Sequence, residues 1–76
     1  MAITVPDLGA PAAFSLWHVR VGDRVTEGDR VAEVLIPGAT VDVPAPVGGV
    51  VVAQAVLAND PLVAGQAIGE IEESGI

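Results

Sequence analysis

The sequence predicts an all-β domain, either a sandwich or a barrel, and three observations lead to that prediction. Short apolar runs rich in valine alternate along the chain with turns that contain glycine or proline. No stretch sustains the periodicity of an amphipathic helix. The chain has one phenylalanine, one tryptophan and no tyrosine, so small aliphatic side chains must fill the core, which favours a thin β structure.

The 76 residues are enough for one small domain with one core, which we place at residues 1–73, with a frayed tail at 74–76. The expected strands cover residues 2–5, 12–21, 30–36, 40–43, 50–57 and 67–72. Glycine, proline, aspartate or asparagine mark the turns between them, at 7–11, 22–29, 44–49, 59–61 and 65. In the second strand, counting by two places Phe14 and Leu16 on one face, and we expect Val19 to lie on that face as well. A helix over 12–21 is the alternative, but Pro11 before it and Gly22-Asp23 after it favour a strand.

Between strands 30–36 and 40–43, the dipeptide Pro37-Gly38 predicts a tight turn. Proline presets φ for the first central position of a type II turn, and glycine accepts the positive φ that the second position requires. Hairpins usually prefer primed turns, which proline cannot adopt at their first central position. We therefore expect a hairpin whose tip splays slightly.

The two halves of the chain repeat each other. Residues 22–34 align with residues 59–71 at the constant offset that separates Gly28 from Gly65, and apolar positions agree as well. Val5-Pro6 corresponds to Val43-Pro44 at an offset one residue longer. The repeat predicts two small sheets packed face to face about a pseudo-two-fold axis, with the Pro37-Gly38 turn at one pole and the chain termini at the other. Chance agreement of glycine-aspartate turns in a valine-rich chain is the alternative.

Composition excludes several classes of function. The net charge is −7, which disfavours binding to nucleic acid or to anionic membranes and suits a partner with a basic surface. The chain contains no cysteine, which excludes disulfides and thiolate metal sites. Neither a membrane-spanning apolar run nor a signal-type N-terminus is present, so we expect a cytoplasmic protein. Arginine is the only basic residue type apart from one histidine, because the chain has no lysine.

Spaced motifs cover almost the whole chain, from about residue 3 to residue 73. They are Val5-Pro6-Asp7-Leu8-Gly9, Trp17, Val21-Gly22-Asp23-Arg24-Val25, Gly28-Asp29, Ala32-Glu33-Val34, Ala39-Thr40-Val41-Asp42-Val43-Pro44-Ala45-Pro46, Gly49-Val50-Val51 and Gly65-Gln66. This pattern resembles the lipoyl domain of dihydrolipoyl acyltransferases, the swinging-arm components of 2-oxo acid dehydrogenase complexes. The related biotinyl domain is a poorer match, since its Met-Lys-Met signature is absent. The resemblance implies a flattened β-barrel, or barrel-sandwich hybrid, of two four-stranded antiparallel sheets with internal pseudo-two-fold symmetry.

The resemblance fails at the tip of the central hairpin. The family carries Asp-Lys-Ala there, and its lysine is the lipoylation site, whereas this chain has Pro37-Gly38-Ala39. Attachment of lipoate needs a primary amine, and Gly38 has no side chain. No lysine elsewhere replaces it, so we expect a degenerate site and no attached cofactor, neither lipoate nor metal.

The residues that we expect to bind a partner are Leu35, Ile36, Pro37, Gly38 and Ala39, because they place apolar groups at an exposed turn. The alternative for Leu35 and Ile36 is packing, since one of two adjacent strand residues faces inward.

The other candidate functional residues give weaker indications of a binding or catalytic site. We expect Trp17 to pack and His18 to lie on the surface, because no nucleophile or partner constellation accompanies this single histidine in the sequence. Glu70, Glu72 and Glu73 would lie near Asp7 as a solvated acidic face, with a divalent metal site as the alternative. Ser15, Thr40 and Ser74 lack a neighbouring base, so we expect no catalytic residues and no enzyme activity of the chain alone.

We therefore expect a non-lipoylatable, lipoyl-like domain that works by binding. It would serve as an accessory subunit of a 2-oxo acid dehydrogenase-like or biosynthetic complex, docking on an enzyme that recognises lipoyl-like carrier domains. In the alternative, its Pro37-Gly38 tip enters and completes a partner's active site. A module of an efflux adaptor fits less well, because those modules are divided by a helical hairpin. A fragment of an acyltransferase is disfavoured by the missing linker after Glu73. We expect a monomer, or weak self-association through residues 50–52.

Overall fold

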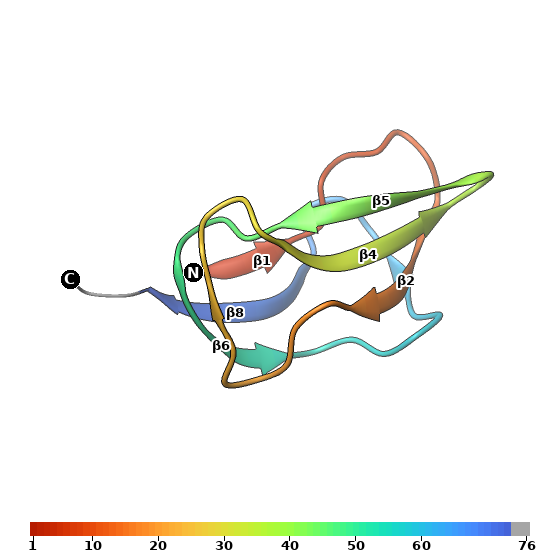
Figure 1. Ribbon diagram of the computed structural model, residues 1–76. Coiled ribbons are helices and arrows are strands. Elements are labelled where there is room, and N and C mark those ends of the chain that lie inside the picture. The colour runs from red at the N-terminus through yellow and green to blue at the C-terminus, as the bar shows by residue number, and fades with distance from the viewer. Residues whose placement is uncertain (74–76) are drawn as a thin grey trace.

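The computed structural model describes residues 1–73, and these residues form an all-β domain (Figure 1). The expected tail at 74–76 lies outside the described residues. The strands are β1 (Ala2–Thr4), β2 (Ala12–Trp17), β3 (Arg24–Val25), β4 (Arg30–Ile36), β5 (Ala39–Pro44), β6 (Gly49–Gln54), β7 (Pro61–Leu62) and β8 (Ala67–Glu73). No helix among residues 1–73 is long and apolar enough to cross a membrane.

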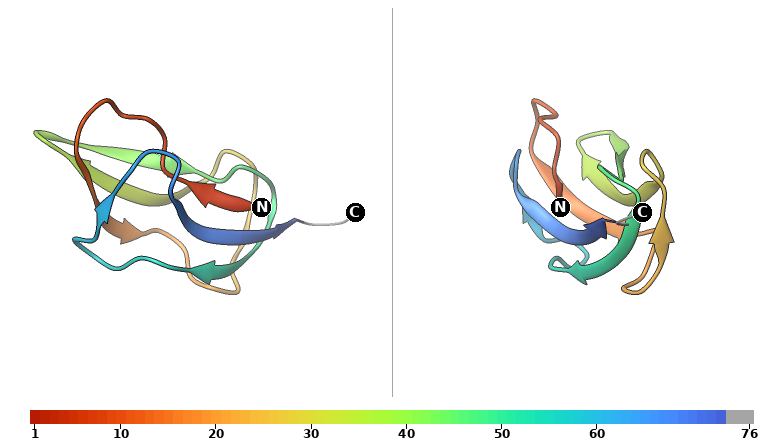
Figure 2. Two further views of the ribbon diagram at one scale, coloured as in Figure 1. Left: turned by 180° about the vertical axis from the view of Figure 1, so that it is seen from behind. Right: turned by 90° about the vertical axis from the view of Figure 1, so that its left-hand side faces the viewer.

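Two four-stranded antiparallel sheets make up the domain, with strand orders β1-β8-β6-β3 and β5-β4-β2-β7. The views in Figure 2 show the two sheets curving around a shared interior. The β4–β5 hairpin extends beyond the body at one end, and the N-terminus and the end of β8 lie at the other. The expected fold class, a flattened barrel of two four-stranded sheets, is therefore confirmed.

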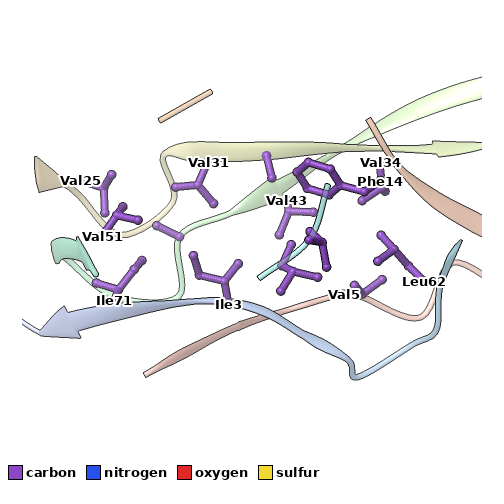
Figure 3. Packing of buried hydrophobic residues seen from close by; sticks show 14 residues of the cluster. Ile3, Val5, Phe14, Val25, Val31, Val34, Val43, Val51, Leu62 and Ile71 are labelled. Carbon is purple, nitrogen blue, oxygen red and sulfur yellow. The ribbon is translucent and has the colours of Figure 1, made fainter. Parts of the chain in front are cut away.

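The core lies between the sheets and is almost entirely aliphatic (Figure 3). Phe14 is the one aromatic side chain among the fully buried residues, and Trp17 packs against the core from its edge with its ring centroid 5.1 Å from that of Phe14. Within residues 1–73, no polar or charged residue is buried. The buried set is Ile3, Val5, Phe14, Val25, Val31, Ala32, Val34, Val43, Ala45, Val51, Val56, Leu62, Ile68 and Ile71.

The repeat with an offset of 37 is reproduced in hydrogen bonds as well as in strands. The amides of Arg20 and Leu57 each donate to the aspartate three residues on, both at 2.9 Å. The amides of Gly28 and Gly65 each cross to the opposite half, donating to Ala45 O at 2.9 Å and to Val5 O at 2.8 Å. Such repetition at equivalent positions excludes chance alignment.

One correspondence read from the sequence is wrong. Because Gly65 donates to Val5 O where Gly28 donates to Ala45 O, Val5 is equivalent to Ala45 and not to Val43. Strand pairing agrees, since Ile3 pairs with Gly69 and Val43 pairs with Ala32. The two loops before the repeated segments therefore differ in length by three residues, which sequence alignment of two short Val-Pro motifs did not detect.

A β-bulge at Ser15 changes which side chains of β2 point toward the core. Phe14 pairs with Val34, but Leu16 pairs with Glu33, so Ser15 is the extra residue. A bulge shifts the alternation of the following side chains, and Leu16 is consequently 43% exposed while Trp17 packs on the core. The sequence prediction is correct for Phe14 and for Val19, which packs against the core, and wrong for Leu16.

Several strands are shorter than expected because side-chain caps start the turns early. The Asp23 carboxylate accepts the Arg20 amide, and Asp60 does the same for Leu57, so β2 and β6 end before those residues.

The expected self-association edge at residues 50–52 is wrong. Strand β6 lies inside its sheet, and Val50 pairs with Glu72 on one side and with Arg24 on the other.

Candidate functional site

The β4–β5 hairpin ends in a two-residue turn, Pro37-Gly38, at the far end of the molecule from the N-terminus and the end of β8 (Figure 1). Gly38 has φ of 78°, the left-handed value that a type II turn requires at its second central residue. The pairing continues through Leu35–Thr40 to Ile36–Ala39. The predicted turn is therefore present, but it does not open the strand ends as expected.

Side chains at this tip are apolar and largely accessible. Leu35 is 37% exposed, and Pro37, Gly38 and Ala39 are exposed. Ile36 is half-buried and lies on the same face of β4 as the fully buried Val34. The alternation thus turns Leu35 outward, and it places Ile36 on the inner side of the hairpin beyond the core cluster.

The tip belongs to a wider apolar end of the molecule, which we call the hairpin pole and define as residues 5–13, 34–41 and 55–66. Asp7 and Asp60 are the only charged residues in these three segments. Both carboxylates accept local backbone amides, from Gly9 at 3.0 Å and from Leu57 at 2.9 Å. Leu57 is 76% exposed here. The hairpin pole therefore presents apolar groups to solvent with little free charge.

A surface hollow of about 340 Å³ opens at the hairpin pole, between the β1–β2 loop and the start of the β7–β8 turn. Leu8, Pro11, Leu62 and Val63 contribute to its mostly apolar walls. The pseudo-two-fold places a second hollow, of about 410 Å³, at the opposite end, where the equivalents of Pro61 and Ala64 are Arg24 and Glu27. The fold thus provides two equivalent hollows, and only the one at the hairpin pole is apolar.

The prediction for Trp17 is confirmed, and the prediction for Asp7 is wrong. Trp17 packs as expected, and its Nε1 donates to Val56 O at 3.4 Å. Asp7 does not join the C-terminal glutamates. It lines the apolar hollow at the hairpin pole, whereas Glu73 lines the hollow at the other end with Arg24. The acidic face predicted from those four residues is therefore not formed.

A polar cluster on the outer face of the β5-β4-β2-β7 sheet was missed at the sequence level. His18 Nε2 lies 3.6 Å from Asp42 Oδ1, and one donor atom each from His18, Glu33 and Asp42 all lie within 4.8 Å of one another. Ser15 Oγ donates to Glu33 Oε1 at 3.3 Å, and Arg30 Nη1 lies 3.5 Å from Asp42 Oδ2. His18 lies on the surface as expected, but the fold gives it partners that the sequence did not reveal. The residues come from three strands or their ends, so only the pairing register of those strands identifies the cluster.

Comparisons with known proteins agree with this architecture. The sequence profile of the biotin/lipoyl family, described as "Biotin-requiring enzyme", matches residues 1–71. Two curated relatives are lipoamide acyltransferase components of branched-chain alpha-keto acid dehydrogenase complexes. The one from Pseudomonas aeruginosa is 44% identical over 54 residues, covering 67% of this chain and 13% of the relative. The one from Pseudomonas putida is 36% identical over 76 residues, covering 96% of this chain and 18% of the relative. The chain thus spans less than a fifth of the length of these relatives.

Among solved structures, the lipoyl domain of the 2-oxoglutarate dehydrogenase complex from Azotobacter vinelandii superposes with a TM-score of 0.74. That match covers 97% of this chain and 100% of the other at 20% sequence identity, which supports the shared fold. The profile match over nearly the whole chain carries the assignment further. This chain belongs to the biotin/lipoyl domain family.

Proposed function

We propose that this chain is a lipoyl-type domain that no longer carries lipoate and that works by docking on an enzyme of a 2-oxo acid dehydrogenase-like complex. The observation that carries the proposal is the Pro37-Gly38 turn at the hairpin tip, in a chain without lysine. Lipoate is carried as an amide of a lysine in this family, and neither tip residue offers an amine. The carrier chemistry of a lipoamide arm is then absent, while the scaffold that presents the tip is kept.

Two further features support docking by the hairpin pole. The tip projects from the body with Leu35, Pro37 and Ala39 exposed, and the surrounding pole has little free charge. Exposed apolar patches of this kind are typical of interaction sites. The relatives named above are components of branched-chain alpha-keto acid dehydrogenase complexes, so we infer a partner among the enzymes of such a complex, and a cytoplasmic location with it.

The loss of attachment is tested directly by mass spectrometry. The purified chain is incubated with lipoate, ATP and a lipoate–protein ligase, beside a lipoyl domain that has a lysine at its tip. The expected result is a lipoyl mass increase in the control domain and none in this chain. A mass increase on this chain would contradict the proposal.

Docking is tested with a pair of matched double variants. Leu35→Ser with Ile36→Ser removes the apolar groups of the tip, whereas Glu72→Ser with Glu73→Ser changes the equivalent positions of β8 at the other pole. Tagged proteins are used to capture partners from the source organism, and the captured 2-oxo acid dehydrogenase and acyltransferase subunits are quantified. Capture should fall at least about tenfold for the tip variant and stay unchanged for the β8 variant, a difference of about 1.4 kcal/mol or more in binding. Equal capture by all three proteins would refute docking through the tip, provided that circular dichroism shows each variant to be folded.

The projecting hairpin also favours a second role, in which the tip enters and completes a partner's active site. The two roles differ in one measurement. Adding the purified chain to the captured enzyme should raise its turnover if the tip completes the site, and should leave turnover unchanged if the chain only docks.

A further inference from the structure

The outer face of the β5-β4-β2-β7 sheet carries a set of metal-ligating groups that the docking role does not use. Glu33 pairs with Asp42 across β4 and β5 and with Leu16 across β4 and β2, so its side chain lies in a cross-strand row on this face. His18 follows β2, and its amide donates to Val31 O at 2.9 Å, which fixes the backbone beside the row. Strand pairing therefore holds the backbone of Glu33 and Asp42, and a backbone hydrogen bond to β4 holds that of His18.

The distances in this cluster suit an ion more than a direct hydrogen bond. His18 Nε2 and Asp42 Oδ1 are 3.6 Å apart, beyond the usual range of about 2.7–3.2 Å for a nitrogen–oxygen hydrogen bond. Zinc binds imidazole nitrogen and carboxylate oxygen at about 2.0–2.2 Å in tetrahedral geometry, which separates two ligand atoms by about 3.3 Å. The ligand atoms of the three residues now lie within 4.8 Å of one another. Small side-chain adjustments would therefore bring all three onto one ion.

Neighbouring groups contact the two carboxylate ligands and orient them. Ser15 Oγ donates to Glu33 Oε1 at 3.3 Å, a contact of the kind that orients ligating carboxylates. Arg30 lies against Asp42 Oδ2 and leaves Oδ1 directed toward His18. The side chains of His18 and Asp42 are 35% and 41% exposed, so an ion can reach them from solvent.

The pseudo-two-fold shows that the fold does not require this cluster. The equivalents of His18, Glu33 and Asp42 in the other half are Ala55, Glu70 and Ala2, so only the glutamate is repeated. Glu70 there accepts the N-terminal amine of Met1 at 2.6 Å. The second half therefore provides an internal control with the same backbone and without the ligand set.

We propose that His18 Nε2, Glu33 and Asp42 bind one divalent transition-metal ion of the zinc class. One imidazole and two carboxylates are ligands that zinc accepts, whereas magnesium and calcium prefer oxygen alone. Three protein ligands leave a further coordination position, open to solvent, for water. The site lies on the sheet face and not at the hairpin tip, so it is independent of the proposed docking role.

The first experiment titrates untagged, chelator-treated protein with ZnCl₂ and records both calorimetry and the ¹⁵N resonances of the imidazole. The chain has a single histidine, so no other imidazole contributes to these signals, and the couplings to the ring protons distinguish Nε2 from Nδ1. We expect saturable binding of one ion with a dissociation constant of about 10–100 μM and a shift of the Nε2 resonance that a large excess of MgCl₂ does not reverse. No saturation below about 1 mM Zn²⁺, or reversal by magnesium, would overturn the proposal.

Variants separate a built site from general attraction to an acidic protein. His18→Ala, Glu33→Gln and Asp42→Asn should each weaken zinc binding at least tenfold, whereas the matched control Glu70→Gln should leave it unchanged. Arg30→Ala should keep or tighten binding, because it removes a cation that competes for Asp42. If Glu70→Gln weakens binding as much as Glu33→Gln does, or if His18→Ala binds like the wild type, the ion is held by net charge and the site does not exist. Circular dichroism of each variant checks that it is folded.

Discussion

Residues 20–36 and 57–73 build the same structure, yet the surfaces at their outer ends differ. Strands β3 and β7 are both two-residue edge strands, and β4 and β8 share the same burial pattern over their first six residues. The turns before them are closed by Asp23 and Asp60 in the same way. At the exposed positions the two segments diverge, since Arg20, Arg24 and Glu27 stand where Leu57, Pro61 and Ala64 stand in the second.

This difference shows which positions the fold constrains. Turn aspartates, turn glycines and inward-facing aliphatic residues are repeated because hydrogen bonds and the shared core depend on them. Solvent-facing residues carry no such constraint, and they have produced one apolar pole and one charged pole on the same backbone. Function is therefore expected at the exposed positions where the halves differ, namely at the hairpin pole and at the His18 cluster.

The largest expected effect concerns the core positions where the halves differ most in size. Phe14 and Val51 are equivalent and both fully buried. Phe14→Ala should lower the free energy of unfolding by about 3–5 kcal/mol through the cavity it leaves, and Val51→Ala by about 2 kcal/mol. Urea denaturation followed by circular dichroism measures both, with Phe14→Leu as a folded intermediate case. Equal losses for the two alanine variants would show that the core does not depend on the single phenylalanine.

The next effect concerns a position where only one half tolerates a methyl group. A Cβ at Gly69 would lie 2.7 Å from Ala53 O and 3.0 Å from Trp17 Cη2, whereas the equivalent Ala32 is fully buried with its methyl group in place. Gly69→Ala should therefore destabilise the protein by about 1–3 kcal/mol. The reverse change Ala32→Gly should cost about 1 kcal/mol. Thermal unfolding of the pair tests this, and a Gly69→Ala variant as stable as the wild type would show that Trp17 and β6 can move aside.

The repeated turn caps should have equal effects. Asp23→Ala and Asp60→Ala each remove one carboxylate that accepts a backbone amide at 2.9 Å. Each should cost about 1 kcal/mol, and the two losses should agree within about 0.5 kcal/mol, a difference typical of neutral surface changes. Denaturant titrations of the two variants measure the losses. A clear inequality would mean that the two turns differ in more than their exposed residues.

The smallest effect is expected from the ion pair at the terminal end of the second half. Glu70 accepts the Met1 amine at 2.6 Å, but both groups are about half exposed, and exposed pairs contribute at most about 1 kcal/mol. Glu70→Gln should cost less than that, and the cost should shrink further at high salt. Unfolding at low and high NaCl concentration tests it, and a salt-independent loss would point to packing of Glu70 instead.

Much of the fold could be predicted from local signals in the sequence. Strand 30–36 was placed at its observed limits because its residues alternate in polarity between two turn signals, and Pro37-Gly38 indicated its turn through backbone preferences alone. The repeat was visible because Gly28 and Gly65 occupy equivalent turn positions that both require a positive φ. The bulge at Ser15 was not predictable, since nothing in Phe14-Ser15-Leu16 distinguishes an extra residue from regular alternation. The interior position of β6 was also missed, because its pairing partners are distant in the sequence.

The sequence determined the fold class, the repeat and the absence of lysine from the hairpin tip, because each can be read from residue types along the chain: aliphatic runs between turns, glycines and aspartates that recur at a constant offset, and no lysine at any position. Only the tertiary structure brought His18 from the end of β2 to Asp42 on β5 across Glu33 on β4, and gathered three distant segments into one apolar pole. Such juxtapositions depend on strand register and sheet order. A shift of register by one residue turns the side chains to the opposite face, so residue types alone cannot specify them.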